Sequence, residues 1–229
     1  MNLKFPISLV GKIAPTGIDL SYLGFHQDLS VAQSYTFSDC DLGEPHPDRQ
    51  IIVAIGTRTF GNFGTLAITI GGVLSTIDQV RVQGENSTYT QIHRAVVPSG
   101  ASGDIVLNFS NASDHLAMHI SIYRAVGSSI SVHDIDTEAF GFVTSSPRTL
   151  TVDAVKGGGL LGVGVRRING GLAWTGGLTA DESVNLSNKV TICTGHTNLS
   201  TDDPTYEATL DLATATRGHA ALLISYKNL

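Results

Sequence analysis

Residues 51–73 read IIVAIGTRTFGNFGTLAITIGGV, and this stretch decides the class of fold. An apolar run over 51–55 is followed by the turn-forming group Gly61-Asn-Phe-Gly64, a second apolar run and the pair Gly71-Gly72. Short apolar runs rich in β-branched residues and bounded by Gly and Asn are typical of buried strands. The stretch therefore predicts a strand, a turn and a second strand.

Residues 160–178, LLGVGVRRINGGLAWTGGL, repeat this pattern in the second half of the chain. The offset between the copies is 109 at Arg58 and Arg167, 105 at Gly71 and Gly176, and 103 at Tyr123 and Tyr226. A drifting offset is expected when short deletions fall in turns. The echo indicates a duplication, although matching hairpin chemistry without common descent also produces such strings.

Further apolar segments flank both copies, separated by turn signals every ~8–12 residues, which is typical of a sandwich or barrel. The expected strands outside the two copies cover 77–82, 89–97, 104–110, 115–126, 149–155, 189–194, 205–212 and 218–227. We therefore predict an all-β protein, an antiparallel, jelly-roll-like β-sandwich with two related halves. The expected core residues are Ile51, Ile55, Ile105, Leu107, Phe109, Ile120, Ile122, Leu161, Val163, Leu210 and Ile224.

The pattern divides the chain into an N-terminal arm (1–34), a first β-sandwich half (35–126), a connector (127–148) and a second β-sandwich half (149–229). The arm is irregular, yet it carries apolar residues such as Phe5, Tyr22 and Phe25. Two hypotheses explain such a segment: it docks the module onto neighbouring subunits, or it packs on its own sandwich as an edge strand.

Composition narrows the range of partners. Of 229 residues, 41% are hydrophobic and 15% charged, and the formal net charge is −6 without a basic run. A phosphate-backbone binder needs clustered Lys and Arg, so nucleic acid is not an expected partner. No apolar stretch reaches the ~18 residues of a membrane span, and the N-terminus lacks a secretory signal pattern. Synthesis in a cytoplasm, with no membrane partner, is the expectation.

One motif resembles a known nucleotide-binding site. Gly157, Gly159 and Gly162 match the spacing G-x-G-x-x-G, and Asp181 and Glu182 follow where a ribose-binding acid would sit. The segment after these glycines is too rich in Gly and Val to form the helix that a dinucleotide site requires. We therefore predict a strand there and no nucleotide site.

Other residues have metal-ligand character. His115 and His119 share one face of an expected strand, but no acid or Cys completes a set nearby. Asp39, Asp41, Glu44 and Asp48 lie in an expected loop over 38–49, where calcium is the alternative to simple solvation. Cys40 and Cys193 match no zinc spacing and are interpreted as buried thiols. No metal and no cofactor is predicted.

The chain contains neither G-x-S-x-G nor G-x-x-x-x-G-K-[ST], so no nucleophile or phosphate loop is indicated. Trp174 with Tyr22, Tyr89 and Tyr206 would suit a sugar-stacking platform, but the buried-strand pattern around Trp174 favours a core position. We predict that the protein is not an enzyme and assign no catalytic residues.

Three segments together resemble a family. They are Ile68–Val73 (ITIGGV), the run 95–110 (AVVPSGASGDIVLNFS) and Ala117–Gly127 (AMHISIYRAVG). They are similar to structural proteins of tailed phages and prophages, which share a T-I-G-G-V turn, a V-P-x-G-x-S-G-D-[IV]-V segment, a strand ending in Tyr, and a later W-T-G-L. Here the last motif is Trp174-Thr-Gly-Gly-Leu178, with one additional Gly. The likeness covers roughly residues 50–228 and leaves the arm unmatched.

The resemblance implies a virion protein, as a head decoration, fibre or tail-associated module, with other capsid or tail subunits as partners and a tendency to homo-oligomerise. The family has no catalytic residues to transfer. Two alternatives remain open: a carbohydrate-binding adhesin module that recognises a host-surface glycan, and a hydrolase whose residues converge only in the fold.

Overall fold

The computed structural model describes residues 17–60, 66–82, 88–110, 114–140, 147–167, 170–186, 190–212 and 218–229. This part of the chain is built from β-strands joined by turns, and it holds no helix suited to crossing a membrane. In the first half the strands are β1 (Asp19–Asp28), β2 (Ser34–Asp41), β3 (Arg49–Phe60), β4 (Leu66–Ile70), β5 (Val73–Leu74), β6 (Thr76–Val82), β7 (Thr88–Val96), β8 (Ser102–Phe109) and β9 (Asp114–Val126). In the second half they are β10 (Ile130–Phe140), β11 (Arg148–Ala154), β12 (Gly159–Arg167), β13 (Leu172–Gly176), β14 (Thr179–Leu186), β15 (Val190–Asn198), β16 (Asp203–Leu212) and β17 (His219–Asn228).

Each half is a sandwich of two antiparallel sheets. In the first half an inner sheet, β1-β9-β3-β7-β6, packs on an outer sheet, β2-β8-β4-β5. In the second half the inner sheet is β10-β17-β12-β15-β14 and the outer sheet is β11-β16-β13. The two inner sheets have the same strand order, position for position, and the outer sheets differ only by β5. The predicted antiparallel β-sandwich with two related halves is confirmed.

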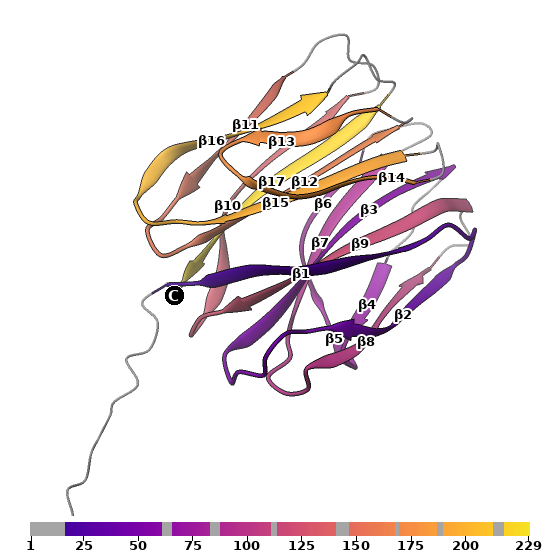
Figure 1. Ribbon diagram of the computed structural model, residues 1–229, viewed down its shortest axis with the longest axis horizontal. Coiled ribbons are helices and arrows are strands. Elements are labelled where there is room, and N and C mark those ends of the chain that lie inside the picture. The colour runs from indigo at the N-terminus through magenta and orange to yellow at the C-terminus, as the bar shows by residue number, and fades with distance from the viewer. Residues whose placement is uncertain are drawn as a thin grey trace, which may run out of the picture.

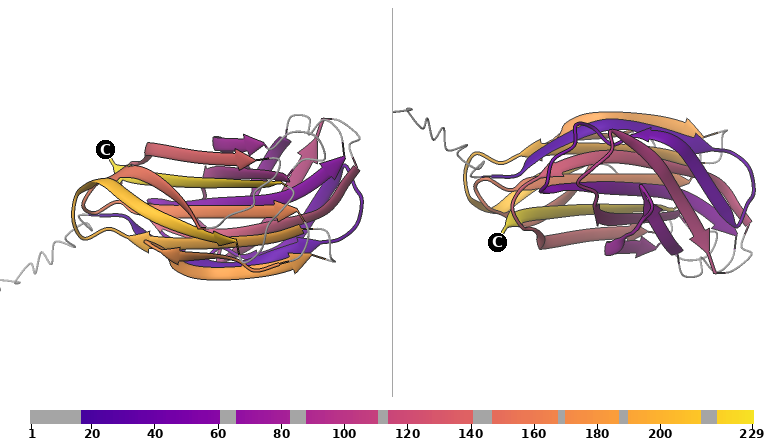
Figure 2. Two further views of the ribbon diagram at one scale, coloured as in Figure 1. Left: turned by 90° about the horizontal axis from the view of Figure 1, so that it is seen from above. Right: turned by 90° about the horizontal axis from the view of Figure 1, so that it is seen from below.

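The two inner sheets pack face to face, so the molecule has four layers (Figure 1). From the bottom to the top of Figure 1 these layers are the first outer sheet, the two inner sheets and the second outer sheet. Figure 2 shows the strands of the stacked layers running in broadly the same direction, as in aligned sheet packing.

This stacking explains the apolar runs from which the fold was predicted. An inner strand is covered on both faces, so its residues read as a continuous apolar run rather than an alternating one. In β3, Ile51, Val53 and Ile55 belong to the core of the first sandwich, whereas Ile52 and Ala54 pack against the second half. All eleven predicted core residues are buried, with 3% exposure or less.

The Gly-Gly pair of the first copy forms a tight hairpin turn. Gly71 and Gly72 have φ of +56° and +80°, and Ile70 pairs with Val73 across them. A two-residue hairpin with positive φ at both positions is a type I′ turn, which strongly favours glycine. The preceding turn, at 61–65, lies outside the described residues.

The structure differs from the predicted boundaries at four strands. β1 lies within the expected arm, and it pairs with β9 as the edge of the first inner sheet. β2 occupies the start of the expected acidic loop, and β10 occupies half of the expected connector. β14 was not expected, because its sequence TADESVNL is polar. The edge-strand hypothesis therefore holds for residues 19–28, and residues 1–16 of the expected arm lie outside the described residues.

Candidate functional site

A polar cluster lies between the two inner sheets, where the edge strand β14 approaches β9. Glu182 is at its centre: its Oε1 lies 3.0 Å from Nε2 of His119, accepts a hydrogen bond of 3.3 Å from Thr194, and accepts a short one from Ser121. The side chain of His119 is fully buried, and that of Glu182 is 5% exposed. The cluster thus joins buried residues of both halves.

Asp181, the neighbour of Glu182, holds a second group. A β-bulge between Ala180 and Glu182 turns its carboxylate inward, where it accepts a 2.8 Å hydrogen bond from the hydroxyl of Tyr123. Nδ1 of His196 lies 2.7 Å from the same carboxylate. Burial, then the charge of Asp181, raises the pKa of Tyr123 well above its usual value, so its hydroxyl stays a donor.

The residue types of this cluster invite comparison with a hydrolytic triad. In a triad the nucleophile and the acid contact different ring nitrogens of the histidine. Here Oγ of Ser121 and Oε1 of Glu182 both lie near Nε2 of His119, at 3.1 and 3.0 Å. Nδ1 of His119 has no hydrogen-bond partner among the described residues. The arrangement does not place an acid behind the histidine, so it lacks the relay that activates a serine.

A related contact lies at the opposite edge of the same interface. The hydroxyl of Tyr226 on β17 donates a 2.9 Å hydrogen bond to Asp78, which occupies a β-bulge of β6. Arg94 completes this group with a 3.0 Å ion pair to Asp78. Each half therefore supplies a tyrosine to a bulge aspartate of the other half, and the two contacts fasten both sides of the interface.

The two edges differ beyond the Tyr–Asp contacts. Going back along β9 from Tyr123 by two residues at a time gives Ser121 and His119, both buried and polar. The same steps back along β17 from Tyr226 give Ile224 and Leu222. The Tyr–Asp contact is thus common to both edges, and the His119–Glu182 contact belongs to one.

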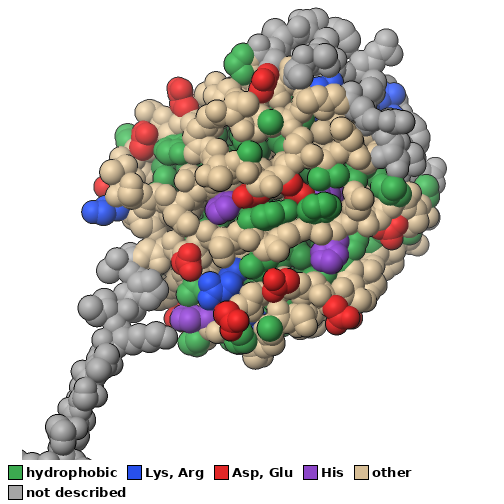
Figure 3. Space-filling model, viewed as in Figure 1, with side chains coloured by type: hydrophobic (Ala, Val, Ile, Leu, Met, Phe, Trp, Pro, Cys, Tyr) green, Lys and Arg blue, Asp and Glu red, His purple; other side chains and the backbone are tan. Residues whose placement is uncertain are grey.

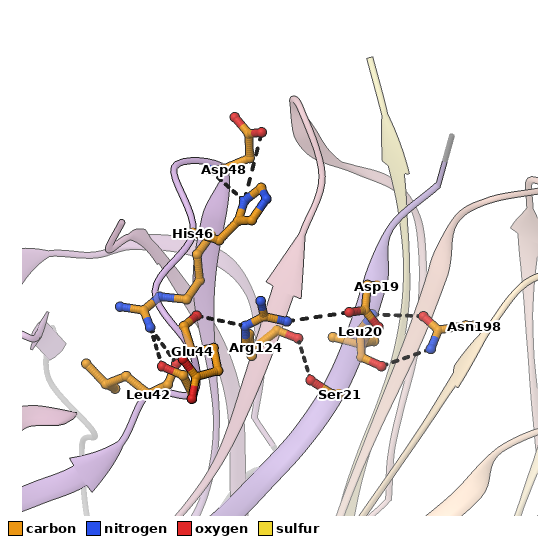
Figure 4. A network of polar contacts seen from close by, with 11 residues as sticks. Asp19, Leu20, Ser21, Leu42, Glu44, His46, Asp48, Arg124 and Asn198 are labelled. Carbon is orange, nitrogen blue, oxygen red and sulfur yellow. Dashed lines mark hydrogen bonds and ion pairs between the residues drawn. The ribbon is translucent and has the colours of Figure 1, made fainter. Parts of the chain in front are cut away.

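The loop over 41–48 is organised by Arg49, whose side chain is fully buried. Its guanidinium donates to the carbonyls of Leu42, Gly43, Val97, Ser99 and Gly100 at 2.6–3.0 Å. Arg124 donates to the carbonyl of Glu44 from the other side and approaches Asp19 (Figure 4). Three of the loop's carbonyls, those of Leu42, Gly43 and Glu44, therefore accept a hydrogen bond from a guanidinium.

Among the residues that the structure describes, no group of three or more His, Cys, Asp or Glu is placed to hold a metal. Lys and Arg are few and scattered on the face drawn in Figure 3, where acidic side chains are spread widely.

A hollow lies where the loop between β7 and β8 meets the β4–β5 turn. Its volume is about 370 Å³, and it is lined by Leu42, Thr69, Gly71, Gly72, Val97, Ser99, Ser102, Gly103, Asp104 and Val106. The amide of Gly71 donates a 2.8 Å hydrogen bond to the carbonyl of Asp104, which holds the two segments together. The hollow thus joins the ITIGGV and PSGASGD segments that were distant in the sequence.

The remaining sequence candidates are dispersed. Gly159 and Gly162 lie in β12, so the predicted strand is confirmed and no helix follows the glycines. Trp174 is 3% exposed in the core of the second sandwich, as favoured. Cys40 and Cys193 are free buried thiols, in the cores of different sandwiches, also as predicted. The side chain of His115 lies outside the described residues.

The aromatic residues considered for a sugar platform do not meet. Tyr89 belongs to the core of the first sandwich, and Tyr22 packs on Tyr123 with ring centroids 5.3 Å apart. Trp174 lies inside the core of the second sandwich, and Tyr206 is partly buried at the edge of that core. A carbohydrate site on Trp174 is therefore wrong for this fold.

The Tyr–Asp contacts between the halves were not predicted from the sequence, although the spacing of their residues contains one signal of them. Asp181 follows Asp78 by 103 residues, and Tyr226 follows Tyr123 by the same number. A shared offset between two residue types identifies positions that recur in both copies.

No protein-family model matches the chain, and no curated protein matches it.

Proposed function

We propose that this chain is a non-enzymatic structural module of a tailed-phage virion, as a head decoration, a fibre or a tail-associated protein. The observation that carries the proposal is that two of the segments that resemble the phage family fix the course of the backbone. Gly71 and Gly72 form a type I′ turn, and the loop that contains Ser99 and Gly100 is fixed by the buried Arg49. Both segments set backbone shape, which is what a structural family has in common.

The four-layer packing supports the same proposal. The two halves share a continuous interface that combines apolar residues with reciprocal Tyr–Asp contacts. Buried polar contacts of this kind penalise other alignments of the two sheets, because each misplaced donor or acceptor would be left unpaired. A block with one fixed geometry suits a particle component that must present the same surface in every copy.

Exposed apolar side chains support contact with other subunits. Val73, Leu74, Ile77 and Val96 are 40%, 70%, 49% and 55% exposed. They lie on β5, β6 and β7, which are neighbours at one corner of the first half. Their partners in this proposal are other capsid or tail subunits, including further copies of this chain.

The test is quantitative mass spectrometry of purified phage particles from a lysogen or lysate that encodes the chain. The proposal predicts peptides from residues 17–229 at a constant ratio to the major capsid protein. Hundreds of copies per particle would assign a decoration role, and a few copies would assign a tail or fibre role. Particles that lack the chain, while the lysate contains it in free form, would contradict the proposal.

A further inference from the structure

The hollow between Gly71 and Gly103 has a glycine at a strand position where the second half has a tyrosine. On β8, Gly103 stands two residues before the buried Ile105. On β16, the corresponding strand of the second outer sheet, Tyr206 stands two residues before the buried Ala208. The hydroxyl of Tyr206 donates to the carbonyl of Gly177, in the Gly-Gly pair of that half. In the first half, a Cβ at Gly103 would lie 3.1 Å from both Cα of Gly71 and Cδ1 of Leu42, so these two residues pack closely where the second half places its tyrosine.

The lining of the hollow selects a class of ligand. Thr69, Ser99 and Ser102 are hydroxyl residues, and the glycines expose backbone around them. Asp104 is the one charged residue among the described residues that line it, and its Oδ1 already accepts a 3.1 Å hydrogen bond from the amide of Asp39. A carboxylate repels anions such as phosphate. It is a strong acceptor for hydroxyl groups, because a charged acceptor roughly doubles the strength of a hydrogen bond.

The volume of the hollow and its aliphatic lining residues also suit a small neutral ligand that carries hydroxyl groups. A volume of about 370 Å³ lies at the small end of ligand pockets, which run from ~300 to ~1,000 Å³. Leu42, Val97 and Val106 add aliphatic surface for the C–H groups of a ring. The walls are held in place by Arg49, which bonds the carbonyls of Leu42, Val97 and Ser99. A site fixed before binding loses less free energy to ordering when a ligand enters.

We infer that this hollow binds one neutral sugar unit, with the carboxylate of Asp104 accepting hydrogen bonds from its hydroxyl groups. The site would let the module recognise a glycan through the first half. It stands independently of the virion assignment, because it concerns the purified chain alone.

The test is NMR titration of the ¹⁵N-labelled full chain with D-glucose, D-galactose, D-mannose and N-acetylglucosamine. Concentrations up to about 50 mM suffice, because a single sugar in a shallow site is expected to bind with a millimolar Kd. The expected result is a saturable shift of the amide signals of Gly71, Gly72 and Gly103 with at least one sugar. No shift of these signals with any of the four would overturn the inference.

Variants assign the binding to this site. Asp104→Asn should weaken it about tenfold or more, since the charged acceptor is lost. Thr69→Val should also weaken it, and Thr175→Val is the matched control. The two threonines occupy corresponding positions. Thr69 directly follows Ile68, which pairs with Leu107 on β8, and Thr175 directly follows Trp174, which pairs with Leu210 on β16. Equal weakening by Thr69→Val and Thr175→Val would count against the site.

Gly103→Tyr introduces the residue of the second half and should abolish binding. A Cβ at Gly103 would lie 3.1 Å from both Cα of Gly71 and Cδ1 of Leu42, so these two lining residues must shift and the hollow changes shape. Asp104→Asn keeps the test decisive if Gly103→Tyr fails to fold. Sugar binding that persists in folded Gly103→Tyr would contradict the assignment. Shifts of the same amide signals caused by the cationic probe Nα-acetyl-lysine methyl ester, and by none of the sugars, would also contradict it.

Discussion

The hydroxyl of Tyr123 in the first half donates a 2.8 Å hydrogen bond to the carboxylate of Asp181 in the second half. Tyr226 and Asp78 repeat this contact with the roles of the halves exchanged. The two aspartates occupy β-bulges of β14 and β6, which are corresponding edge strands of the two inner sheets. The two tyrosines lie on β9 and β17. The interface is therefore reciprocal, as expected when one duplicated sandwich packs on the other.

Tyr123→Phe and Tyr226→Phe should each lower the free energy of unfolding by ~1–3 kcal/mol, because each leaves a nearly buried carboxylate with one donor fewer. The side chains of Asp181 and Asp78 are 5% and 2% exposed. Urea denaturation monitored by fluorescence measures the change. Tyr206→Phe is the control, expected to cost below about 0.5 kcal/mol, since solvent can replace its exposed contact. Equal effects of all three substitutions would argue against a special role of the interface.

Arg49→Lys should destabilise the protein by about 2–4 kcal/mol, even though the charge is retained. Lysine has three donors on one nitrogen and cannot reproduce the planar fork that reaches five carbonyls. Arg124→Lys tests the same loop from its exposed side and should cost below ~1 kcal/mol, as surface ion pairs do. Comparable urea midpoints for the two variants would show that the carbonyl cage is not what stabilises the loop.

The stability of the protein should fall as pH drops from about 6.5 to 4. Burial lowers the pKa of His93 to about 4, so the unfolded chain takes up a proton before the folded chain does. Stability conferred by the neutral ring is complete above the unfolded pKa of ~6.5 and is lost by about pH 4, at roughly 1.4 kcal/mol per pH unit. His93→Gln should reduce this slope by about that amount. An unchanged slope in the variant would show that His93 titrates normally in the folded state.

Deleting residues 1–25 should strongly destabilise the chain or make it insoluble. The deletion removes Ile18 and Leu20, which are 6% and 1% exposed, and part of strand β1. Burial of each such side chain contributes ~1.5–3 kcal/mol. Deletion of residues 1–16, which keeps every described strand, is the comparison. If the chain without residues 1–25 melted like the shorter deletion, β1 would be dispensable to the core.

Much of the fold could be predicted from the sequence. Four strands that were not predicted share one property. β1, β2, β10 and β14 are all edge strands of their sheets. An edge strand has one neighbour and is partly exposed, so it carries the polar residues that natural proteins place at edges. The sequences ISVHDIDTEAF and TADESVNL therefore lack the apolar signal that identified β3 and β12. Propensity and periodicity therefore detect buried strands more readily than edge strands, although the edge strands β6, β11 and β13 were predicted.

The interfacial contacts were harder to predict for a different reason. Glu182 and His119 are 63 residues apart, and only the packing of β14 over β9 brings them together. Arg49 resembles any surface arginine in the sequence, because its five partners are backbone carbonyls without a side-chain signature. The hollow could not be predicted either, because Gly71, Gly72 and Gly103 line it with backbone and have no side-chain pattern in the sequence.

The account rests on the two sandwiches forming one block through their inner faces, and differential scanning calorimetry tests this claim most directly. Separating the halves would expose the interfacial cluster that contains Ile52, Leu161 and Ile224, so neither half should melt alone. We predict a single transition for the full chain, with a calorimetric enthalpy equal to the van't Hoff enthalpy. Two resolved transitions, or a calorimetric enthalpy about twice the van't Hoff value, would show that the halves unfold separately and would contradict the account.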